Sequence, residues 1–149
     1  MVGVLHGRKS FLGECYRQEI PVFCPGITDS ALGLQMHFFK QDHKDFAVDV
    51  TADMGEMAAM VLSAKKTGAI ILGGGISKHY TIASNLLRGG LDYAVYVTTA
   101  GEFDGSLSGA RASEAKSWGK IGEKATTATV HADATLAFPM IYSGLKPRR

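Results

Sequence analysis

Cysteine, tryptophan and proline are scarce in this chain of 149 residues, which contains two, one and four of them respectively. Cys15 and Cys24 do not have CxxC spacing, so the sequence indicates neither a disulfide framework nor a zinc knuckle. The histidines form no metal-ligand spacing with these cysteines or with one another, so we predict no metal site. Unpaired cysteines in turn favour a reducing, cytoplasmic setting.

Long apolar runs and a large excess of either charge are also missing. No run approaches the roughly 20 residues that a membrane-spanning helix needs, and residues 1–10 lack the apolar stretch of a signal peptide. Sixteen Lys and Arg face 14 Asp and Glu, with a basic run only at 146–149, which argues against a nucleic-acid footprint. We therefore expect a soluble protein with no membrane or nucleic-acid partner.

The pattern that is present points to an α/β fold in one domain over residues 1–149, because 46% of the residues are hydrophobic and 20% are charged. From residue 44 onward, short apolar runs rich in branched side chains alternate with segments of helical period. Strands are expected at 19–23, 46–50, 69–72, 93–97 and 126–131, and helices at 51–66, at about 77–87 and from Ser113. Thr51 or Asp53 can cap the first of these helices.

Strands that are joined by helices run parallel, and ligands then gather at the carboxyl ends of the strands. The sequence therefore predicts a Rossmann-like, open and mostly parallel sheet flanked by helices.

Three glycines at 73–75 follow one expected strand and precede a helix. Glycines let the backbone approach an anion, and the N–H groups of a helix start point toward it. Position 78 is Lys78 rather than the last glycine of a GxGxxG motif, so spacing alone supports a structural turn at least as well as a nucleotide loop. His79 could transfer protons or bind substrate, but a lone histidine is more often a surface or capping group.

Two polar segments follow along the chain. The loop at 98–112 places acids, hydroxyls and glycines beyond a strand end, where ribose hydroxyls or amines could bind, although the same composition suits a solvated loop. Glu114, Trp118 and Lys120 then lie within seven residues. A lysine against an aromatic wall can lose solvation, which frees its amine for imine chemistry, but most lysines are simply exposed. The residues alone leave both interpretations open.

Taken together, these stretches resemble the deoxyhypusine synthase family over about residues 19–140. The matching segments are 20–25 with 28–29, 70–75 with 78–79, 92–96, 102–106 with 108–111, 114–115 with 117–121, and 132–134 with 138–139. No single segment is decisive, but the ordered set is highly specific. The resemblance implies the C-terminal, catalytic portion of that fold, with the N-terminal half of the family absent.

Members of this family use NAD to dehydrogenate spermidine. They pass its aminobutyl group through an imine on an enzyme lysine to one lysine of the translation initiation factor 5A precursor, and they reduce the new imine with the retained hydride. The resemblance assigns the imine-forming lysine to Lys120 and a catalytic, amine-binding role to His79. It assigns further substrate contacts to Trp118, Glu114 and Lys78. The NAD contacts that it implies are Asp29, Gly74, Thr99, Ala100, Asp104, Gly105, Ser108 and Asp133.

Two departures from the family bear on the substrate and on the assembly. Eukaryotic members carry aspartates that anchor the amine where this chain has Leu34 and Leu107. The resemblance therefore also admits a homospermidine synthase-like transferase acting on a small amine, or a catalytically incomplete paralogue that binds and regulates a partner. Family chains are much longer and form homotetramers, so the expected partners include further copies of this chain or a separate N-terminal half.

Overall fold

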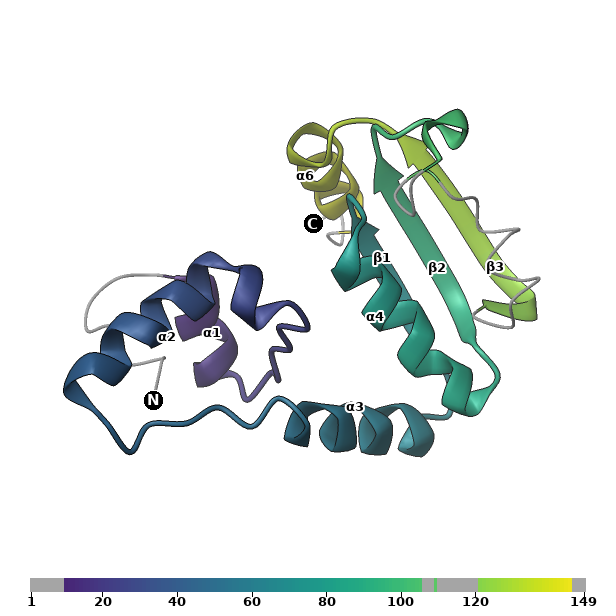
Figure 1. Cartoon of the computed structure of the whole chain (residues 1–149). Coiled ribbons are helices and arrows are strands. Elements are labelled where there is room, and N and C mark those ends of the chain that lie inside the picture. Colours follow the sequence, from purple (N-terminus) through teal and green to yellow (C-terminus); the bar gives the residue numbers. More distant parts are fainter. Residues whose placement is uncertain (1–9, 106–108, 110–120, 146–149) are drawn as a thin grey trace.

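The computed structural model describes residues 10–105, residue 109 and residues 121–145 (Figure 1). The helices of this part are α1 (Phe11–Arg17), α2 (Ala31–Asp42), α3 (Ala52–Ser63), α4 (Ile76–Ser84) and α6 (Ala134–Leu145). The strands are β1 (Gly68–Leu72), β2 (Leu91–Thr98) and β3 (Ile121–His131). Short 3-10 helices are η1 (Ile27–Asp29), η2 (Asn85–Arg88) and η3 (Glu102–Asp104).

The strands form one parallel sheet in the order β1-β2-β3, so β2 is central. In this register Ile71 lies opposite Tyr96, and Val97 lies opposite Val130. The predicted α/β architecture, an open parallel sheet flanked by helices, is confirmed (Figure 1). Because the strands share one direction, their carboxyl ends lie at one edge of the sheet, which we call the carboxyl edge.

One face of the sheet packs against α4 and holds the core. The buried cluster consists of Ile71, Ile82, Leu91, Ala94, Tyr96 and Ile121. Ala94 and Tyr96 share this face because residues two apart along a strand point the same way. Ile82 of α4 covers them, so burial of apolar surface holds the helix on the sheet at roughly 1.5–3 kcal/mol for each large side chain.

The opposite face is covered in part by α6, which contacts β2. Val97 on this face is fully buried, and Ala137 of α6 is also buried. Of the helices in the described residues, none is both long and apolar enough to cross a membrane.

Two helices, α1 and α2, form where the apolar pattern predicts none. A serine caps each of them: Ser10 Oγ accepts the N–H of Gly13 at 3.0 Å, and Ser30 Oγ accepts the N–H of Gly33 at 2.9 Å. An N-cap serine satisfies a backbone donor that the helix leaves without an internal partner. These serines are the sequence signal for both helices, which an analysis of apolar spacing alone does not use.

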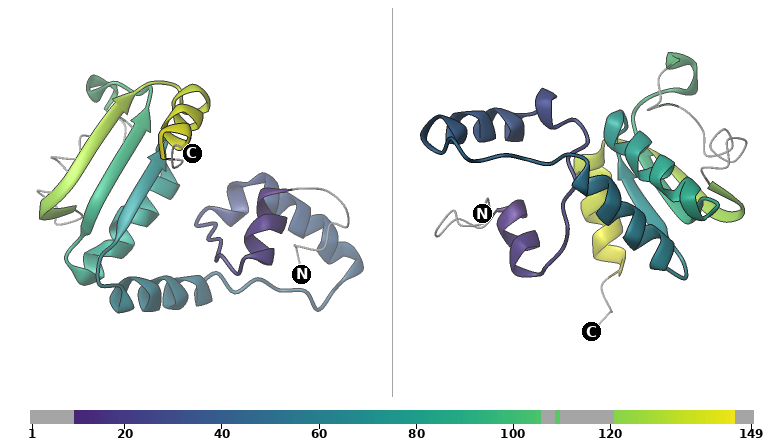
Figure 2. Two further views of the ribbon diagram at one scale, coloured as in Figure 1. Left: turned by 180° about the vertical axis from the view of Figure 1, so that it is seen from behind. Right: turned by 60° about the horizontal axis from the view of Figure 1, so that its bottom comes forward.

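The two helices form a group apart from the sheet, and an extended connection at 43–51 joins α2 to α3 (Figures 1 and 2). α3 in turn contacts α4. The segment between α1 and α2 also contacts α4, since the ring of Phe23 lies 6.3 Å from the ring of Tyr80.

The strands expected at 19–23 and 46–50 do not form. A strand requires ladder hydrogen bonds to a neighbour, and the sheet of the described residues contains only β1, β2 and β3. Phe46 contacts Phe39 of α2 instead, with ring centroids 5.1 Å apart, while Val48 and Val50 are exposed. The apolar pattern at 46–50 therefore does not produce a strand, because no strand of the described residues pairs with this segment.

Thr51 is the N-cap residue of α3, in agreement with one of the two predicted caps, but its side chain makes no capping hydrogen bond, and Asp49 supplies the side-chain acceptor at this helix start. The Asp49 carboxylate accepts the backbone N–H groups of Thr51 at 2.9 Å and Ala52 at 3.1 Å. The hydroxyl of Thr51 also donates to the Asp49 carboxylate, at 2.6 Å. These hydrogen bonds, the one from the Thr51 hydroxyl first, hold the pKa of Asp49 below its ordinary value.

We expect the two faces of β1 to differ in their sensitivity to truncation. Ile71 is 7% exposed in the core, whereas its neighbour Ile70 is 52% exposed on the opposite face. Ile71→Ala should lower the free energy of unfolding by about 2–5 kcal/mol because it removes buried surface and leaves a cavity, and Ile70→Ala by less than about 1 kcal/mol. Urea denaturation followed by circular dichroism measures both values. Equal losses would contradict the assigned core.

Candidate functional site

Backbone hydrogen bonds bring together the segments that follow β1, β2 and β3. Gly73 N–H donates to the carbonyl of Val97 at 2.8 Å, and Ala132 N–H donates to the carbonyl of Thr98 at 3.2 Å. The glycine turn, the loop after β2 and the start of α6 therefore meet at the carboxyl edge. Six of the eight predicted cofactor contacts lie in these segments: Gly74, Thr99, Ala100, Asp104, Gly105 and Asp133.

The glycine turn at 73–75 has a backbone that other residues rarely adopt. Gly73 and Gly75 have φ angles of 77° and 74°. A Cβ atom added to either would have no neighbour within 4 Å, so space beside the turn is open. Gly75 precedes the first residue of α4, and no side chain caps that helix start. The first-turn N–H groups of α4 can therefore donate to an anion.

The loop after β2 presents hydroxyl and carboxylate oxygens at the same edge. Thr98, which is buried, uses its Oγ1 to accept the N–H of Ala100 at 3.1 Å. Asp104 Oδ2 accepts the N–H of Gly101 at 2.6 Å, which closes the turn formed by η3. Gly105 follows with φ 63°, and Thr99 and Asp104 are exposed. Thr98 and Asp104 thus fold the loop, which leaves Thr99 and Asp104 exposed as possible hydrogen-bond acceptors.

Asp133 provides a further carboxylate at the start of α6. Its Oδ1 accepts the N–H of Thr135 at 2.8 Å and also the hydroxyl of that residue. These two hydrogen bonds, the hydroxyl one first, lower the pKa of Asp133. The group is therefore an ionised acceptor at neutral pH, which suits it to bind a ribose hydroxyl.

Asp29 lies in η1 and comes from a different part of the chain. A Cβ atom on Gly26, the residue before η1, would lie 3.6 Å from the side chain of Ile76, the first residue of α4. η1 therefore begins close to the start of α4, and Asp29 is exposed there. Together with the glycine turn and the carboxylates, this donor and acceptor set could hold the phosphates and riboses of a dinucleotide.

Lys78 and His79 lie in the first turn of α4 but point to different surroundings. Lys78 is 3% exposed, and its Nζ lies 4.4 Å from the centre of the Tyr96 ring. His79 is exposed, and its backbone N–H donates to the carbonyl of Gly75 at 3.1 Å. Consecutive helical residues are about 100° apart around the axis, which separates an inward lysine from an outward imidazole.

Tyr96 and Thr98 are buried polar residues at this edge that the sequence analysis does not assign to the site. The hydroxyl of Tyr96 is buried without a hydrogen-bond partner, and burial raises its pKa. Two residues apart on β2, they follow Ala94 on the face that α4 covers. The spacing of two residues could have placed Tyr96 and Thr98 on one face of the strand. It could not have shown that both are buried, because their burial depends on α4.

Four predicted residues, Ser108, Glu114, Trp118 and Lys120, lie outside the described residues. The next described residue after them, Ile121, begins β3 and pairs with Leu91 at the amino end of β2. Among the residues that are described, no three His, Cys, Asp or Glu side chains come close enough to hold a metal ion.

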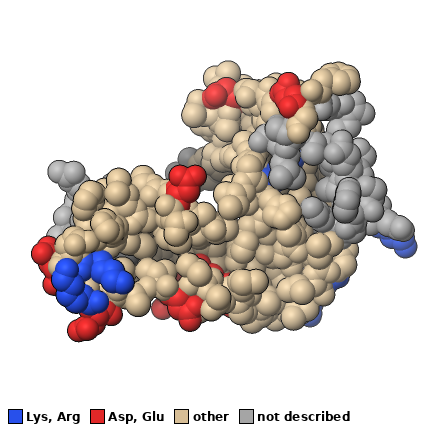
Figure 3. All heavy atoms as spheres, in the orientation of Figure 1, with Lys and Arg blue, Asp and Glu red and all other residues tan. Residues whose placement is uncertain are grey.

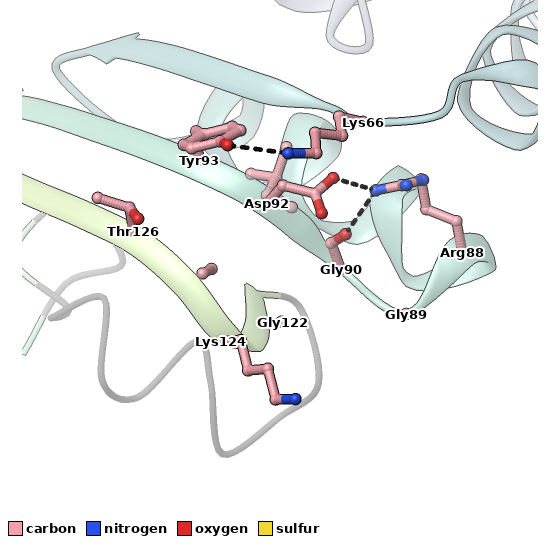
Figure 4. A pocket seen from close by; sticks show the side chains of 11 residues that line it. Lys66, Arg88, Gly89, Gly90, Asp92, Tyr93, Gly122, Lys124 and Thr126 are labelled. Atoms are coloured by element: carbon pink, nitrogen blue, oxygen red, sulfur yellow. Dashed lines mark hydrogen bonds and ion pairs between the residues drawn. The ribbon is translucent and has the colours of Figure 1, made fainter.

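A separate cavity of about 260 Å³ lies at the amino ends of β2 and β3 (Figure 4). Arg88 lines it and donates to the Asp92 carboxylate at 2.6 Å and to the carbonyl of Gly90 at 3.2 Å. Lys66 also lines it and donates to the Tyr93 hydroxyl at 3.3 Å. Arg88 and Lys66 thus hydrogen-bond to residues at the start of β2. The charged lining of the cavity is therefore explained by its part in holding the fold together.

The Asp92 carboxylate makes stability dependent on pH. A hydrogen bond from the Thr67 N–H, and then the Arg88 guanidinium, lower the pKa of Asp92 below its ordinary value of 3.8. A carboxylate whose pKa is lower in the folded state stabilises the fold above the unfolded-state pKa, and loses this effect as pH falls through the folded-state value.

We therefore expect Asp92→Asn to lower the melting temperature at pH 7 and to approach the wild-type protein as the pH falls below 3.8. Thermal unfolding across a pH series measures the difference. Asp45→Asn, on the exposed connection after α2, is the matched control. A wild-type advantage over Asp92→Asn that did not shrink in acid would contradict the assignment.

Gly75 should not tolerate a side chain. Its φ of 74° and ψ of −147° lie in a region that is essentially restricted to glycine, so Gly75→Ala should cost about 1–3 kcal/mol. Gly55 lies inside α3 with open space around it, and Gly55→Ala should stabilise the protein by up to about 1 kcal/mol. Urea denaturation of both variants tests the turn, and a Gly75→Ala protein as stable as Gly55→Ala would refute its geometry.

Comparison with known proteins places this arrangement in a family. The model of the deoxyhypusine synthase family matches residues 2–145. A probable deoxyhypusine synthase of Pyrococcus furiosus is 49% identical over 135 residues, which cover 89% of this chain and 40% of that protein. The corresponding protein of Ignicoccus hospitalis is 46% identical over 145 residues, 95% of this chain and 46% of its own length.

A third relative, the probable deoxyhypusine synthase of Thermoplasma acidophilum, is 47% identical over 137 residues, 92% of this chain and 44% of that protein. The chain thus spans less than half the length of these relatives. Since the family model covers nearly the whole sequence, the chain belongs to the deoxyhypusine synthase family.

Proposed function

We propose that this chain carries the catalytic portion of a deoxyhypusine synthase. In the proposed reaction the aminobutyl group of spermidine passes, through an imine on Lys120, to a lysine of the translation initiation factor 5A precursor. The observation that carries the proposal is the glycine turn with an uncapped helix start, set beside Asp104 and Asp133 at the carboxyl edge in a member of this family. An aminobutyl transferase acting on a translation factor would work in the cytoplasm.

NAD is the proposed cofactor, and the residues at the carboxyl edge fit it. The first-turn N–H groups of α4 would hold its phosphates, and the Asp133 carboxylate would accept a ribose hydroxyl. The residues proposed to contact NAD are Asp29, Gly74, Thr99, Ala100, Asp104, Gly105, Ser108 and Asp133. When bound, NAD supplies a hydride acceptor for the amine carbon and later returns the hydride to the product imine.

Lys120 is the proposed nucleophile because imine formation needs a neutral primary amine. A pocket that disfavours the ammonium form keeps part of the lysine deprotonated. Trp118 and Glu114 are proposed to hold the polyamine, since an aromatic face and a carboxylate both attract ammonium groups. Attack of the Lys120 amine on the oxidised spermidine carbon transfers the aminobutyl group, and 1,3-diaminopropane leaves.

His79 and Lys78 are proposed to act at the start of α4. The imidazole of His79 is exposed, so it can approach the reacting amine and take part in proton transfer. Lys78 is buried against the ring of Tyr96, so it is suited to hold the start of α4 in place against β2.

One observation favours a second acceptor. Leu34 is exposed on α2 and has no polar group, so it cannot anchor an ammonium group as the aspartate of eukaryotic members does. A homospermidine synthase-like transfer to a small diamine is therefore the alternative function. Incubation with putrescine or with the factor 5A precursor in parallel distinguishes the two acceptors. The proposed active assembly is a homotetramer or a complex with the rest of the family fold.

We expect incubation with NAD and spermidine, followed by borohydride reduction, to attach an aminobutyl group to Lys120. Peptide mass spectrometry locates the added mass. Lys120→Arg should abolish the adduct because a guanidinium does not form the imine, whereas Lys124→Arg, an exposed lysine four positions away, should retain it.

An adduct on another lysine in the wild-type protein would overturn the assignment of Lys120. If a folded protein forms no adduct alone but forms one when the rest of a relative's chain is added, the chemistry stands and needs that portion. If it forms none in either sample, the proposed function is wrong.

A further inference from the structure

Thr98, the last residue of β2, is hydrogen-bonded to two of the segments that meet at the carboxyl edge. Its Oγ1 accepts the backbone N–H of Ala100 at 3.1 Å, and its main-chain carbonyl accepts the N–H of Ala132 at 3.2 Å. Ala100 is a proposed NAD contact, and Ala132 directly precedes another, Asp133. Thr98 therefore joins two parts of the proposed cofactor site, although nothing in the sequence assigns it to that site.

The hydroxyl of Thr98 is held in a fixed place. Thr98 is 7% exposed, and it is paired with His131 of β3 in the sheet. A β-branched side chain has few χ1 rotamers, so the position of Oγ1 follows that of the strand. A buried hydroxyl needs a hydrogen-bond partner, and the Ala100 N–H supplies one. The sheet thus presents a rigid acceptor to the loop that follows it.

This hydrogen bond sets the direction of the peptide group between Thr99 and Ala100. No cis peptide bond occurs in the described residues, and the N–H and C=O groups of a trans peptide point in opposite directions. With the Ala100 N–H turned toward Thr98, the carbonyl of Thr99 is turned away from it. The Thr98 hydroxyl therefore decides which way both groups of this peptide face.

Asp104 makes a similar contact one residue later, since its Oδ2 accepts the N–H of Gly101 at 2.6 Å. Two successive N–H groups, those of Ala100 and Gly101, are thus engaged within the chain. Acidic side chains, drawn red, are visible at the top of the sheet in Figure 3, the end where β2 and β3 finish in Figure 1. The loop therefore meets a ligand mainly through acceptor oxygens, which suits the hydroxyl groups of a ribose.

We infer that Thr98 is a positioning residue of the cofactor site. Its buried hydroxyl fixes the loop after β2, so that Thr99 and Ala100 keep the arrangement in which they bind a ribose of NAD. Thr98 acts through Ala100 and does not itself contact the cofactor. The inference rests on the proposed function, because it takes NAD to be the ligand at the carboxyl edge.

A packing role for Thr98 predicts the opposite response to two substitutions. Thr98→Val keeps the branched shape and removes the hydroxyl, whereas Thr98→Ser keeps the hydroxyl and removes a methyl group. If the side chain only fills space, the valine variant should resemble wild type more closely. If the hydroxyl positions the loop, the serine variant should do so.

Amide hydrogen exchange of the ligand-free 149-residue chain, followed by NMR, tests the contact itself. Thr98→Val should raise the exchange rate of the Ala100 amide by about two- to tenfold, the effect of losing one hydrogen bond. Thr98→Ser should stay within about twofold of wild type. Thr126→Val is the matched control, since it makes the same substitution at an exposed position near the amino end of β3 and should leave Ala100 unchanged.

Calorimetric titration with NAD tests the consequence for binding. Thr98→Val should raise the Kd by about three- to tenfold, while Thr98→Ser and Thr126→Val should stay within about twofold of wild type. Circular dichroism confirms that each variant is folded. If the valine variant does not fold, Thr98→Ala gives the same comparison, because it differs from Thr98→Ser only by the hydroxyl.

The inference is overturned if the valine variant matches wild type in Ala100 exchange or in its Kd for NAD, or if the serine variant loses as much affinity as the valine variant. A wild-type chain that binds no NAD, alone or with the rest of a relative's chain added, would overturn both proposals. Weaker NAD binding by Thr98→Val, with no adduct on Lys120 in the wild type, would refute the proposed transfer reaction and leave the positioning role intact.

Discussion

Parallel pairing of β2 with β1 on one side and β3 on the other is the constraint on which the candidate site depends. It sends three connecting segments out at one edge of the sheet, where the Gly73 and Ala132 backbones bond directly to the last residues of β2. Residues that are far apart in the sequence thereby contribute to one surface. Without this pairing the glycine turn and Asp133 would have no reason to lie near each other.

The amino ends of the strands have a different task. Arg88 joins the carbonyl of Lys65, the hydroxyl of Thr67 and the carboxylate of Asp92, so one guanidinium holds the chain before β1 against the chain before β2. Thr67, Arg88 and Asp92 at this end bond one another, whereas the buried Oδ1 of Asn85 in η2 has no hydrogen-bond partner among the described residues. Polar side chains at the carboxyl edge include the buried Tyr96 hydroxyl without a partner, together with exposed Asp104 and Asp133. The exposed carboxylates at the carboxyl edge agree with ligand binding there.

The same topology leaves the opposite face of the sheet partly uncovered. A sheet of three strands offers two faces and two edges, and α4 with α6 cover only part of that area. The chain therefore keeps large apolar side chains in contact with water at a cost in free energy that burial against another polypeptide would remove.

Local sequence determined the strands β1, β2 and β3, the helices α3 and α4, and the glycine turn, because periodicity and conformational preference act over a few residues. It also carries the family resemblance, including Lys120. Only the tertiary structure decided that the segments at 19–23 and 46–50 lack strand partners, since an alternating pattern does not specify a neighbour. It likewise decided that Lys78 is buried on Tyr96 while His79 is exposed, because burial depends on which side of α4 meets the sheet.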